Sequence, residues 1–183
     1  MMVRSLRLAL FLWAATAALA GAPVRAQASE DAVKAAFLPK FARYIDMPAA
    51  AKPSPGQPFY LCLIGRDPFG PLIDRAAANE TIDGHAVAVR RFANVDSAAI
   101  AGCHIAFVAG SSDEATGQML VTLRRQATLT ITDARMGRAR GMIHFTVIDG
   151  RVRFRIDQVA ASARSITVSS RLLALAVGVN QEP

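Results

Sequence analysis

The chain has 183 residues, a formal net charge of +7 at pH 7 and two cysteines. This length is enough for one domain with a single hydrophobic core. The charge gives little support to nucleic-acid binding, because three arginines lie in the first 26 residues and the remaining 157 residues carry only +4.

The first 26 residues have the pattern of a secretory signal peptide. Two arginines precede an apolar stretch from Leu8 to Leu19, and small residues follow it. That stretch is shorter than the roughly 20 residues needed to cross a bilayer. We therefore predict cleavage near Gln27 or Ser29, a periplasmic location if the source is a Gram-negative bacterium, and a single α/β domain over residues 27–183.

A helix is predicted directly after the cleavage region. Ser29 is a favourable N-cap, and the acidic Glu30 and Asp31 suit the positive end of the helix dipole. Pro39 predicts a kink or break near residue 38, because proline lacks a backbone donor. Residues at helical spacing predict one apolar face: Val33, Phe37, Phe41, Tyr44 and Ile45. A linker rich in proline follows, Ala49–Pro58.

Short apolar segments then alternate with helical ones. The predicted strands are Phe59–Gly65, Ala86–Arg91, His104–Ala109 and Thr128–Thr132. The predicted helices between them are Phe69–Asn79, Val95–Ala101 and Asp113–Gln126. This alternation predicts a mostly parallel sheet with helices on both faces, which is a three-layer Rossmann-like α/β sandwich.

The C-terminal part predicts an antiparallel extension of that sheet. Asp149-Gly150 is a two-residue hairpin signal between the predicted strands Met142–Ile148 and Arg151–Ile156. Ser169 or Ser170 is expected to cap a final helix that runs to about Val177. Its inward-facing residues are predicted to be Leu172, Leu173 and Ala176.

The two cysteines each lie in an apolar segment that is predicted to be a buried strand. Cys62 and Cys103 are the only pair available for oxidation in an exported chain. The first and third strands of doubly wound sheets are neighbours. We therefore predict a disulfide between Cys62 and Cys103.

Familiar catalytic and cofactor motifs are missing from the sequence. Gly65 and Gly70 have the glycine spacing of a phosphate loop, but Pro71-Leu72 stands where that loop has Lys-Ser/Thr. The three histidines are far apart and lack the short spacings of a zinc site. We predict no enzyme activity, no cofactor and no metal.

Two groups of polar residues are candidates for binding. Arg66, Ser111 and Asp133 follow predicted parallel strands, and ligands usually bind beyond the carboxyl ends of such strands. Arg151, Arg153 and Arg155 alternate with apolar residues, so one face of that strand is a row of guanidinium groups. The row is either a solvated face of an edge strand or a contact for an acidic partner or small anion.

An ordered series of short segments carries a family resemblance. The segments are Val33-Lys34-Ala35-Ala36-Phe37-Leu38, Cys62-Leu63-Ile64-Gly65-Arg66-Asp67-Pro68-Phe69-Gly70, Cys103-His104-Ile105-Ala106-Phe107, Gly141-Met142-Ile143, Val152-Arg153-Phe154-Arg155-Ile156 and Ser169-Ser170-Arg171-Leu172-Leu173-Ala174-Leu175-Ala176. In this order and spacing they resemble the YfiR-like family. The resemblance covers essentially the whole chain after the signal peptide.

The resemblance implies a periplasmic repressor that binds the periplasmic domain of a membrane-anchored diguanylate cyclase and lowers cyclic di-GMP, with an effect on biofilm. The alternative is a periplasmic small-molecule sensor or carrier. We expect neither nucleic-acid binding nor membrane insertion, and a homodimer remains an open alternative. The candidate partner-binding residues are Phe37, Lys40, Arg43, Tyr44, Arg151, Arg153 and Arg155.

Overall fold

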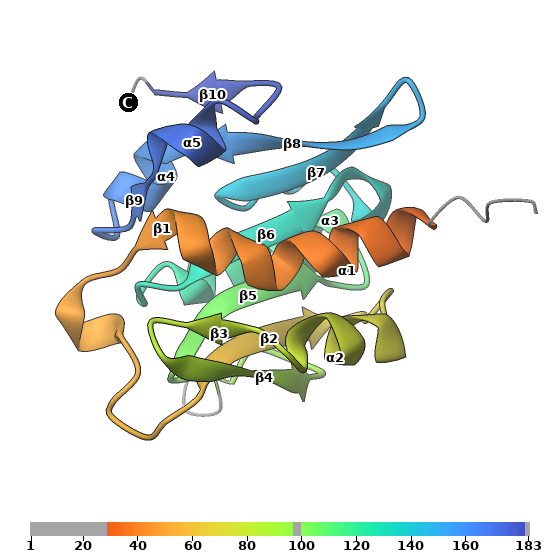
Figure 1. Ribbon diagram of the computed structural model, residues 1–183. Helices are drawn as coiled ribbons and strands as arrows, with labels where there is room; N and C mark the ends of the chain where they lie inside the picture. Colours follow the sequence, from red (N-terminus) through yellow and green to blue (C-terminus); the bar gives the residue numbers. More distant parts are fainter. Residues whose placement is uncertain (1–28, 97–99, 182–183) are drawn as a thin grey trace, which may run out of the picture.

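The predicted alternation of strands and helices is present in the computed structural model, which describes residues 29–96 and 100–181 (Figure 1). The predicted signal peptide, residues 1–26, lies outside the described residues. Among the described residues, no helix has the length and apolar character that a membrane span requires.

One curled sheet forms the centre of the molecule, with the strand order β10-β8-β7-β6-β5-β2-β4-β3. Its five middle strands run parallel to one another: β4 (His85–Phe92), β2 (Phe59–Gly65), β5 (Cys103–Ala109), β6 (Leu129–Asp133) and β7 (Ile143–Ile148). The first four of these agree within one residue at each end with the predicted strands. The mostly parallel α/β fold is therefore confirmed.

Short strands complete the architecture at the margins. Antiparallel β3 (Thr81–Ile82) closes one edge of the sheet, and β8 (Arg151–Asp157) with β10 (Val179–Asn180) closes the other. A separate two-stranded sheet pairs β1 (Ile45–Asp46) with β9 (Thr167–Val168). The two-residue strands β1, β3, β9 and β10 are too short to show the periodicity from which a strand is predicted.

Alternating side chains of β2 divide the core into two layers. Phe59, Leu61 and Leu63 pack with residues of α1 (Glu30–Phe41) and α2 (Pro71–Ala77) on one face of the sheet. Cys62 and Ile64 point to the other face, where α3 (Asp113–Leu123) supplies Leu120 and Leu123. The three-layer arrangement follows from this alternation, since every second residue of a strand faces the same side.

Helix α1 begins as predicted but buries a different face. The Ser29 hydroxyl accepts a hydrogen bond from the Ala32 amide at 3.2 Å. Of the predicted face Phe41 is buried, whereas Phe37, Tyr44, Ile45 and Val33 are only half-buried. The buried face is centred instead on Lys34, Ala35 and Leu38. The buried face is rotated about the helix axis relative to the predicted one. It could not be predicted from apolar residues alone, because a lysine lies at its centre.

Pro39 does not break α1 near residue 38, so the break that was predicted as one of two outcomes is absent. The helix continues to Phe41 and is followed by the 3-10 turn Ala42–Tyr44. The proline stands in the last turn of the helix and is itself buried. The helix tolerates Pro39 because the proline removes only one backbone hydrogen bond, close to the C-terminal end of the helix, where helices fray in any case.

Several predicted helices are shorter or differently placed. Helix α2 begins at Pro71, where proline suits the first helical position, and α3 ends at Leu123. The helix predicted at Val95–Ala101 is not seen at its described positions, since Val95 and Asp96 are irregular and 100–102 form a turn. Residues 97–99 of that prediction lie outside the described residues.

The last predicted helix is also cut short. Helix α5 (Ser170–Leu173) is capped by the Ser169 hydroxyl but ends well before Val177. The reason is tertiary pairing, because the Val177 amide donates to the Phe154 carbonyl at 3.0 Å and Gly178 accepts from the Ile156 amide at 3.0 Å. These bonds draw the chain out to form β10 beside β8. The short helix α4 (Gln158–Ser162) was not predicted.

The hairpin of β7 and β8 forms at the predicted turn. Asp149 and Gly150 both have positive φ, at 49° and 69°, as the favoured two-residue hairpin turn requires. Phe145 lies opposite Phe154 in the register, and both are buried. Phe154 packs edge-on against Phe41, with ring centroids 5.2 Å apart. The apolar side of the hairpin therefore faces α1, and the arginine row faces away from it.

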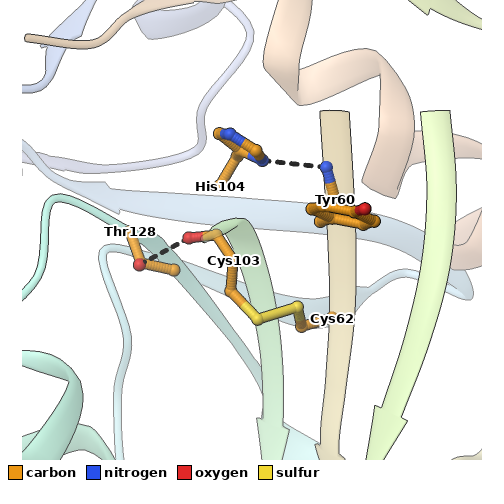
Figure 2. The surroundings of a disulfide bond; sticks show 5 residues. All are labelled: Tyr60, Cys62, Cys103, His104 and Thr128. Carbon is orange, nitrogen blue, oxygen red and sulfur yellow. Dashed lines mark hydrogen bonds between the residues drawn. A yellow bond between two sulfur atoms is a disulfide. The ribbon is translucent and has the colours of Figure 1, made fainter. Parts of the chain in front are cut away.

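The predicted disulfide joins Cys62 of β2 to Cys103 of β5, two adjacent parallel strands (Figure 2). The Cα atoms are 5.8 Å apart, which is within the usual range for a disulfide. Both cysteines are buried. Beside the bond, the Thr128 hydroxyl donates to the Cys103 carbonyl at 2.7 Å. The crosslink therefore connects two central strands at the beginning of β5.

Candidate functional site

The carboxyl ends of the parallel strands β2, β5 and β6 lie together at one end of the sheet, as the sequence predicted. Arg66, which follows β2, donates from Nε to the Gly110 carbonyl at 2.9 Å and from a terminal nitrogen to the Met136 carbonyl at 3.3 Å. A Cβ on Gly65 would lie 2.2 Å from the Ala109 carbonyl oxygen, so only glycine fits between the two loops. Ser111 is exposed nearby in sequence, in the loop after β5. Arg66 thus binds the loops together.

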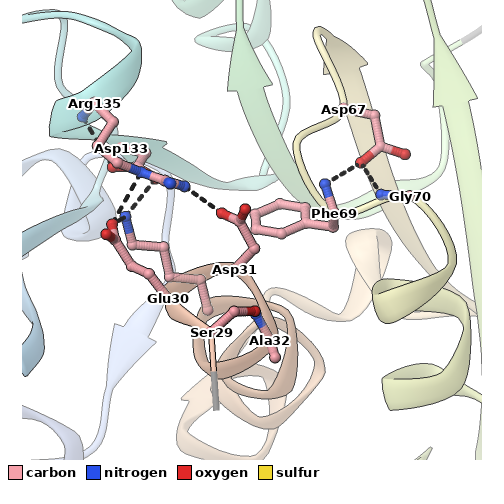
Figure 3. Close-up of polar contacts among 10 residues, drawn as sticks. Ser29, Glu30, Asp31, Ala32, Asp67, Phe69, Gly70, Asp133 and Arg135 are labelled. Atoms are coloured by element: carbon pink, nitrogen blue, oxygen red, sulfur yellow. Dashed lines mark hydrogen bonds and ion pairs between the residues drawn. The ribbon is translucent and has the colours of Figure 1, made fainter. Parts of the chain in front are cut away.

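Asp133, the third candidate ligand residue, lies under α1 instead of at an open surface. Its carboxylate is fully buried and accepts a charge-assisted hydrogen bond from Lys34 Nζ at 2.6 Å. Arg135 approaches the same oxygen at 3.2 Å and also pairs with Glu30 and Asp31 (Figure 3). We call these five residues the helix clamp, because they attach the first turns of α1 to the end of β6.

The burial of Lys34 was not predicted, because lysine is seldom buried. Its side chain has no exposed surface, and Nζ also pairs with Glu30 one helical turn earlier. The ammonium group lies 5.8 Å from the centre of the Phe145 ring. The i,i+4 spacing of Glu30 and Lys34 was the one available signal, but it is equally typical of an exposed helix face.

A second polar cluster fixes the turn between β2 and α2. The Asp67 carboxylate accepts hydrogen bonds from the amides of Phe69 at 2.8 Å and Gly70 at 3.0 Å (Figure 3). Arg91 of β4 then pairs with Asp67 at 2.8 Å and with Asp74 at 2.7 Å. Its hydrogen bonds to Asp74 lower the pKa of that carboxyl group. The polar groups of this turn therefore pair with one another and stabilise the fold.

A surface pocket lies near the opposite ends of these strands. It has a volume of about 650 Å³ and is lined by the 50–58 linker, Tyr60, Arg90 and His104. The Arg90 guanidinium stacks on the Tyr60 ring at 4.0 Å, which favours a structural role for both residues. The described residues contain no group of three or more His, Cys, Asp or Glu side chains that could hold a metal ion.

The candidate partner-binding residues fall on two separate surfaces. Phe37, Lys40, Arg43 and Tyr44 lie on or just after α1, over one face of the sheet. The side chains of Arg151, Arg153 and Arg155 alternate with Val152 and Phe154 and so lie on the other face. The structure does not bring these two groups together.

The helix-end group is partly engaged in packing. Phe37 stacks on Phe41 with ring centroids 5.9 Å apart, and Tyr44 is half-buried against the core. Arg43 pairs with Glu80 at 2.5 Å. Lys40 is exposed and makes no ion pair within the described part of the chain. Only Lys40 therefore presents an uncommitted charge here.

The hairpin of β7 and β8 combines exposed charge with exposed apolar surface. Ile148 lies opposite Arg151 in the register, and Thr146 lies opposite Arg153. Ile148 is 38% exposed, whereas the exposed Val147 lies opposite Val152 and faces the other side of the hairpin. We call Ile148, Arg151 and Arg153 the hairpin-tip surface. Exposed apolar and arginine side chains together are typical of protein contacts.

Two buried histidines connect neighbouring strands. His104 Nδ1 accepts a hydrogen bond from the Tyr60 amide at 2.8 Å (Figure 2). His144 Nδ1 lies 2.8 Å from the Thr132 hydroxyl. Burial lowers the pKa of His104 below its ordinary value of 6.5. Burial, followed by the positive charge of Arg140, lowers the pKa of His144 in the same way.

These histidines predict a loss of stability in mild acid. The unfolded chain takes up protons near pH 6.5, before the folded protein does, so the free energy of unfolding falls as the pH decreases from about 7.5 to about 5.5. The slope is at most about 1.4 kcal/mol per pH unit for each histidine. Urea unfolding at several pH values measures it. The double variant His104→Asn/His144→Asn should be markedly flatter, and an equally steep slope in that variant would exclude these two groups.

Comparison with known proteins was made by sequence. A family model described as YfiR/HmsC-like matches residues 31–177, which include nearly all of the described chain. No curated protein matches this sequence. The matched range contains the disulfide, the hairpin-tip surface and the helix clamp except for Glu30.

Proposed function

Because this chain belongs to the YfiR/HmsC-like family, we propose that it inhibits an inner-membrane diguanylate cyclase by binding the periplasmic domain of that enzyme. Members of the family are periplasmic regulators of diguanylate cyclases. The family match over residues 31–177 is the observation that carries the proposal. Inhibition of the cyclase would lower cellular cyclic di-GMP.

Two further features agree with a periplasmic location. The first 26 residues have the composition of a secretory signal peptide. The disulfide between Cys62 and Cys103 is of a kind that persists in oxidising compartments and is rare in the cytosol. Both features support contact with the periplasmic part of a membrane protein.

A protein of this kind acts by shifting the equilibrium between the active and inactive states of the cyclase. It can silence the enzyme only by binding the inactive state more tightly than the active state. A 100-fold shift between the two states requires about 2.7 kcal/mol of differential binding. A few well-placed contacts are sufficient to supply this free energy.

The hairpin-tip surface is the contact that we favour. Arg151 and Arg153 make no ion pair with any described residue, so their charges are available to an acidic partner. Ile148 adds exposed apolar area on the same face of the hairpin. The end of α1 offers less, since Arg43 is paired with Glu80 and Phe37 is packed against the core. That end is retained as the second surface to test.

We predict that deletion of the gene raises cyclic di-GMP several-fold, but only in a strain that retains the partner cyclase. Wild-type protein should restore the low level. The hairpin-tip variant Arg151→Glu/Arg153→Glu should fail to restore it, because charge reversal repels an acidic contact. Cyclic di-GMP in cell extracts measured by mass spectrometry, with the periplasmic amount of each variant measured by immunoblot, provides the readout.

Matched variants make the result specific. Arg75→Glu/Arg171→Glu changes the net charge equally at exposed positions away from the hairpin and should complement normally. Lys40→Glu/Tyr44→Ala tests the end of α1. A chain lacking residues 1–26 should stay in the cytoplasm and fail to complement. Unchanged cyclic di-GMP in the deletion strain, with an active cyclase present, would refute the proposed function.

A further inference from the structure

Five cationic or basic side chains gather around two adjoining cavities on the face of the sheet that carries the arginine row. The cavities have volumes of about 420 and about 90 Å³ and share Arg140, Gly141 and Asp157 in their walls. Arg155 and His144 line the larger cavity, and Arg124 and Arg164 line the smaller one. We call this region the arginine cleft, defined by Arg124, Arg140, His144, Arg155 and Arg164.

The backbone brings these residues together from distant parts of the chain. His144 of β7 lies directly opposite Arg155 of β8 in the antiparallel register. Arg124 caps the end of α3, and Arg164 follows α4. At the wall, the Arg155 guanidinium lies close to Gly178, where a Cβ would be 2.7 Å from it and would displace the arginine side chain. The cleft is therefore a product of the fold, and no sequence motif encodes it.

The arginines of the cleft lack ion-pair partners among the described residues. Within the described residues, no carboxylate forms an ion pair with Arg124, Arg140 or Arg155. The one acidic wall residue is Asp157, and its carboxylate already accepts hydrogen bonds from the Ala160 amide at 2.8 Å and from the Asn180 side chain at 3.4 Å. By contrast, Arg91 and Arg135 each pair with carboxylates.

Burial and like charge act in the same direction on the basic groups of the cleft. Burial, and then the charge of Arg124, lowers the pKa of Arg164, and Asp157 opposes this effect. The pKa of His144 is lowered by burial and then by Arg140, with Arg155 acting in the same direction. Asp133 opposes this effect on His144, and Lys34 reinforces it. A bound anion would relieve the repulsion among these groups.

We propose that the arginine cleft binds a small anion bearing phosphate or carboxylate groups, held mainly by Arg140 and Arg155. Guanidinium groups bind both kinds of anion through paired, charge-assisted hydrogen bonds. His144 also lines the larger cavity, with its Nδ1 held 2.8 Å from the Thr132 hydroxyl. The larger cavity lies within the usual size range of small-molecule sites.

The test is a calorimetric titration of the purified, oxidised mature protein with pyrophosphate and, separately, with citrate at low ionic strength. We expect one saturable site for at least one probe, and the stronger of the two identifies phosphate or carboxylate as the preferred group. Arg140→Gln/Arg155→Gln should weaken binding by about 100-fold, since each charge-assisted contact contributes about tenfold or more. Purified protein is used, so the result does not depend on the proposed cyclase.

A matched control separates a specific site from general charge. Arg75→Gln/Arg171→Gln removes the same charge at exposed positions outside the cavity walls and should change the affinity by less than about twofold. Arg140 is exposed and its side chain has no hydrogen bond to a described residue, so Arg140→Gln alone tests the cleft without risk to folding. Equal weakening by the control pair, or no saturable binding of either probe, would overturn the proposal.

Discussion

Replacing Lys34 by methionine is expected to lower the free energy of unfolding by about 3 to 5 kcal/mol, the usual cost of removing one partner from a buried ion pair. Methionine keeps most of the apolar volume of the lysine stem, so the loss reports mainly on charge. The Asp133 carboxylate has no exposed surface and would keep the hydrogen bond from the Arg135 amide at 3.0 Å, but its one remaining cationic partner would be the Arg135 side chain at 3.2 Å. Urea unfolding followed by circular dichroism measures the change.

The design includes a control lysine and a compensating change. Lys40 is exposed on the same helix, and Lys40→Met should change stability by less than about 0.5 kcal/mol. The double variant Lys34→Met/Asp133→Asn removes both charges and should recover much of the loss, because no unpaired charge stays buried. Equal effects at Lys34 and Lys40 would show that the helix clamp contributes nothing to stability.

Reducing the disulfide between Cys62 and Cys103 is expected to destabilise the protein by roughly 4 kcal/mol. The bond closes a loop across a sequence separation of 41 residues, and the chain-entropy model assigns about that free energy to a loop of this length. Oxidised protein and protein refolded with dithiothreitol can be compared in urea at the same pH. Both forms contain the same side chains, so the difference isolates the crosslink.

Two observations check the disulfide prediction independently. The variant Cys62→Ala/Cys103→Ala should unfold at the same urea concentration with and without dithiothreitol, which excludes other effects of the reductant. Protein purified from the periplasm should contain no free thiols under denaturing conditions. Two free thiols per chain, or a wild-type unfolding midpoint that does not respond to reduction, would contradict the prediction.

The longer strands of the sheet could be predicted from local sequence patterns. The apolar segments around Cys62 and Cys103 predicted β2 and β5 within one residue, and their neighbouring positions led to the correct disulfide. Asp149-Gly150 predicted both the turn and the register of the hairpin. These features could be predicted because strand periodicity and turn chemistry depend on residues that are adjacent in the chain.

Only the tertiary structure decided which polar residues are buried and which are free. Lys34 and Asp133 are 99 residues apart, and nothing local indicates that they pair under α1. Helix α5 ends at Leu173 because Val177 bonds to β8, although its own sequence favours a longer helix. The arginine cleft likewise combines side chains from α3, β7, β8 and the segment after α4. Charge pairing and cavity formation depend on distances between elements, and the fold sets those distances, whereas the order of residues along one element does not.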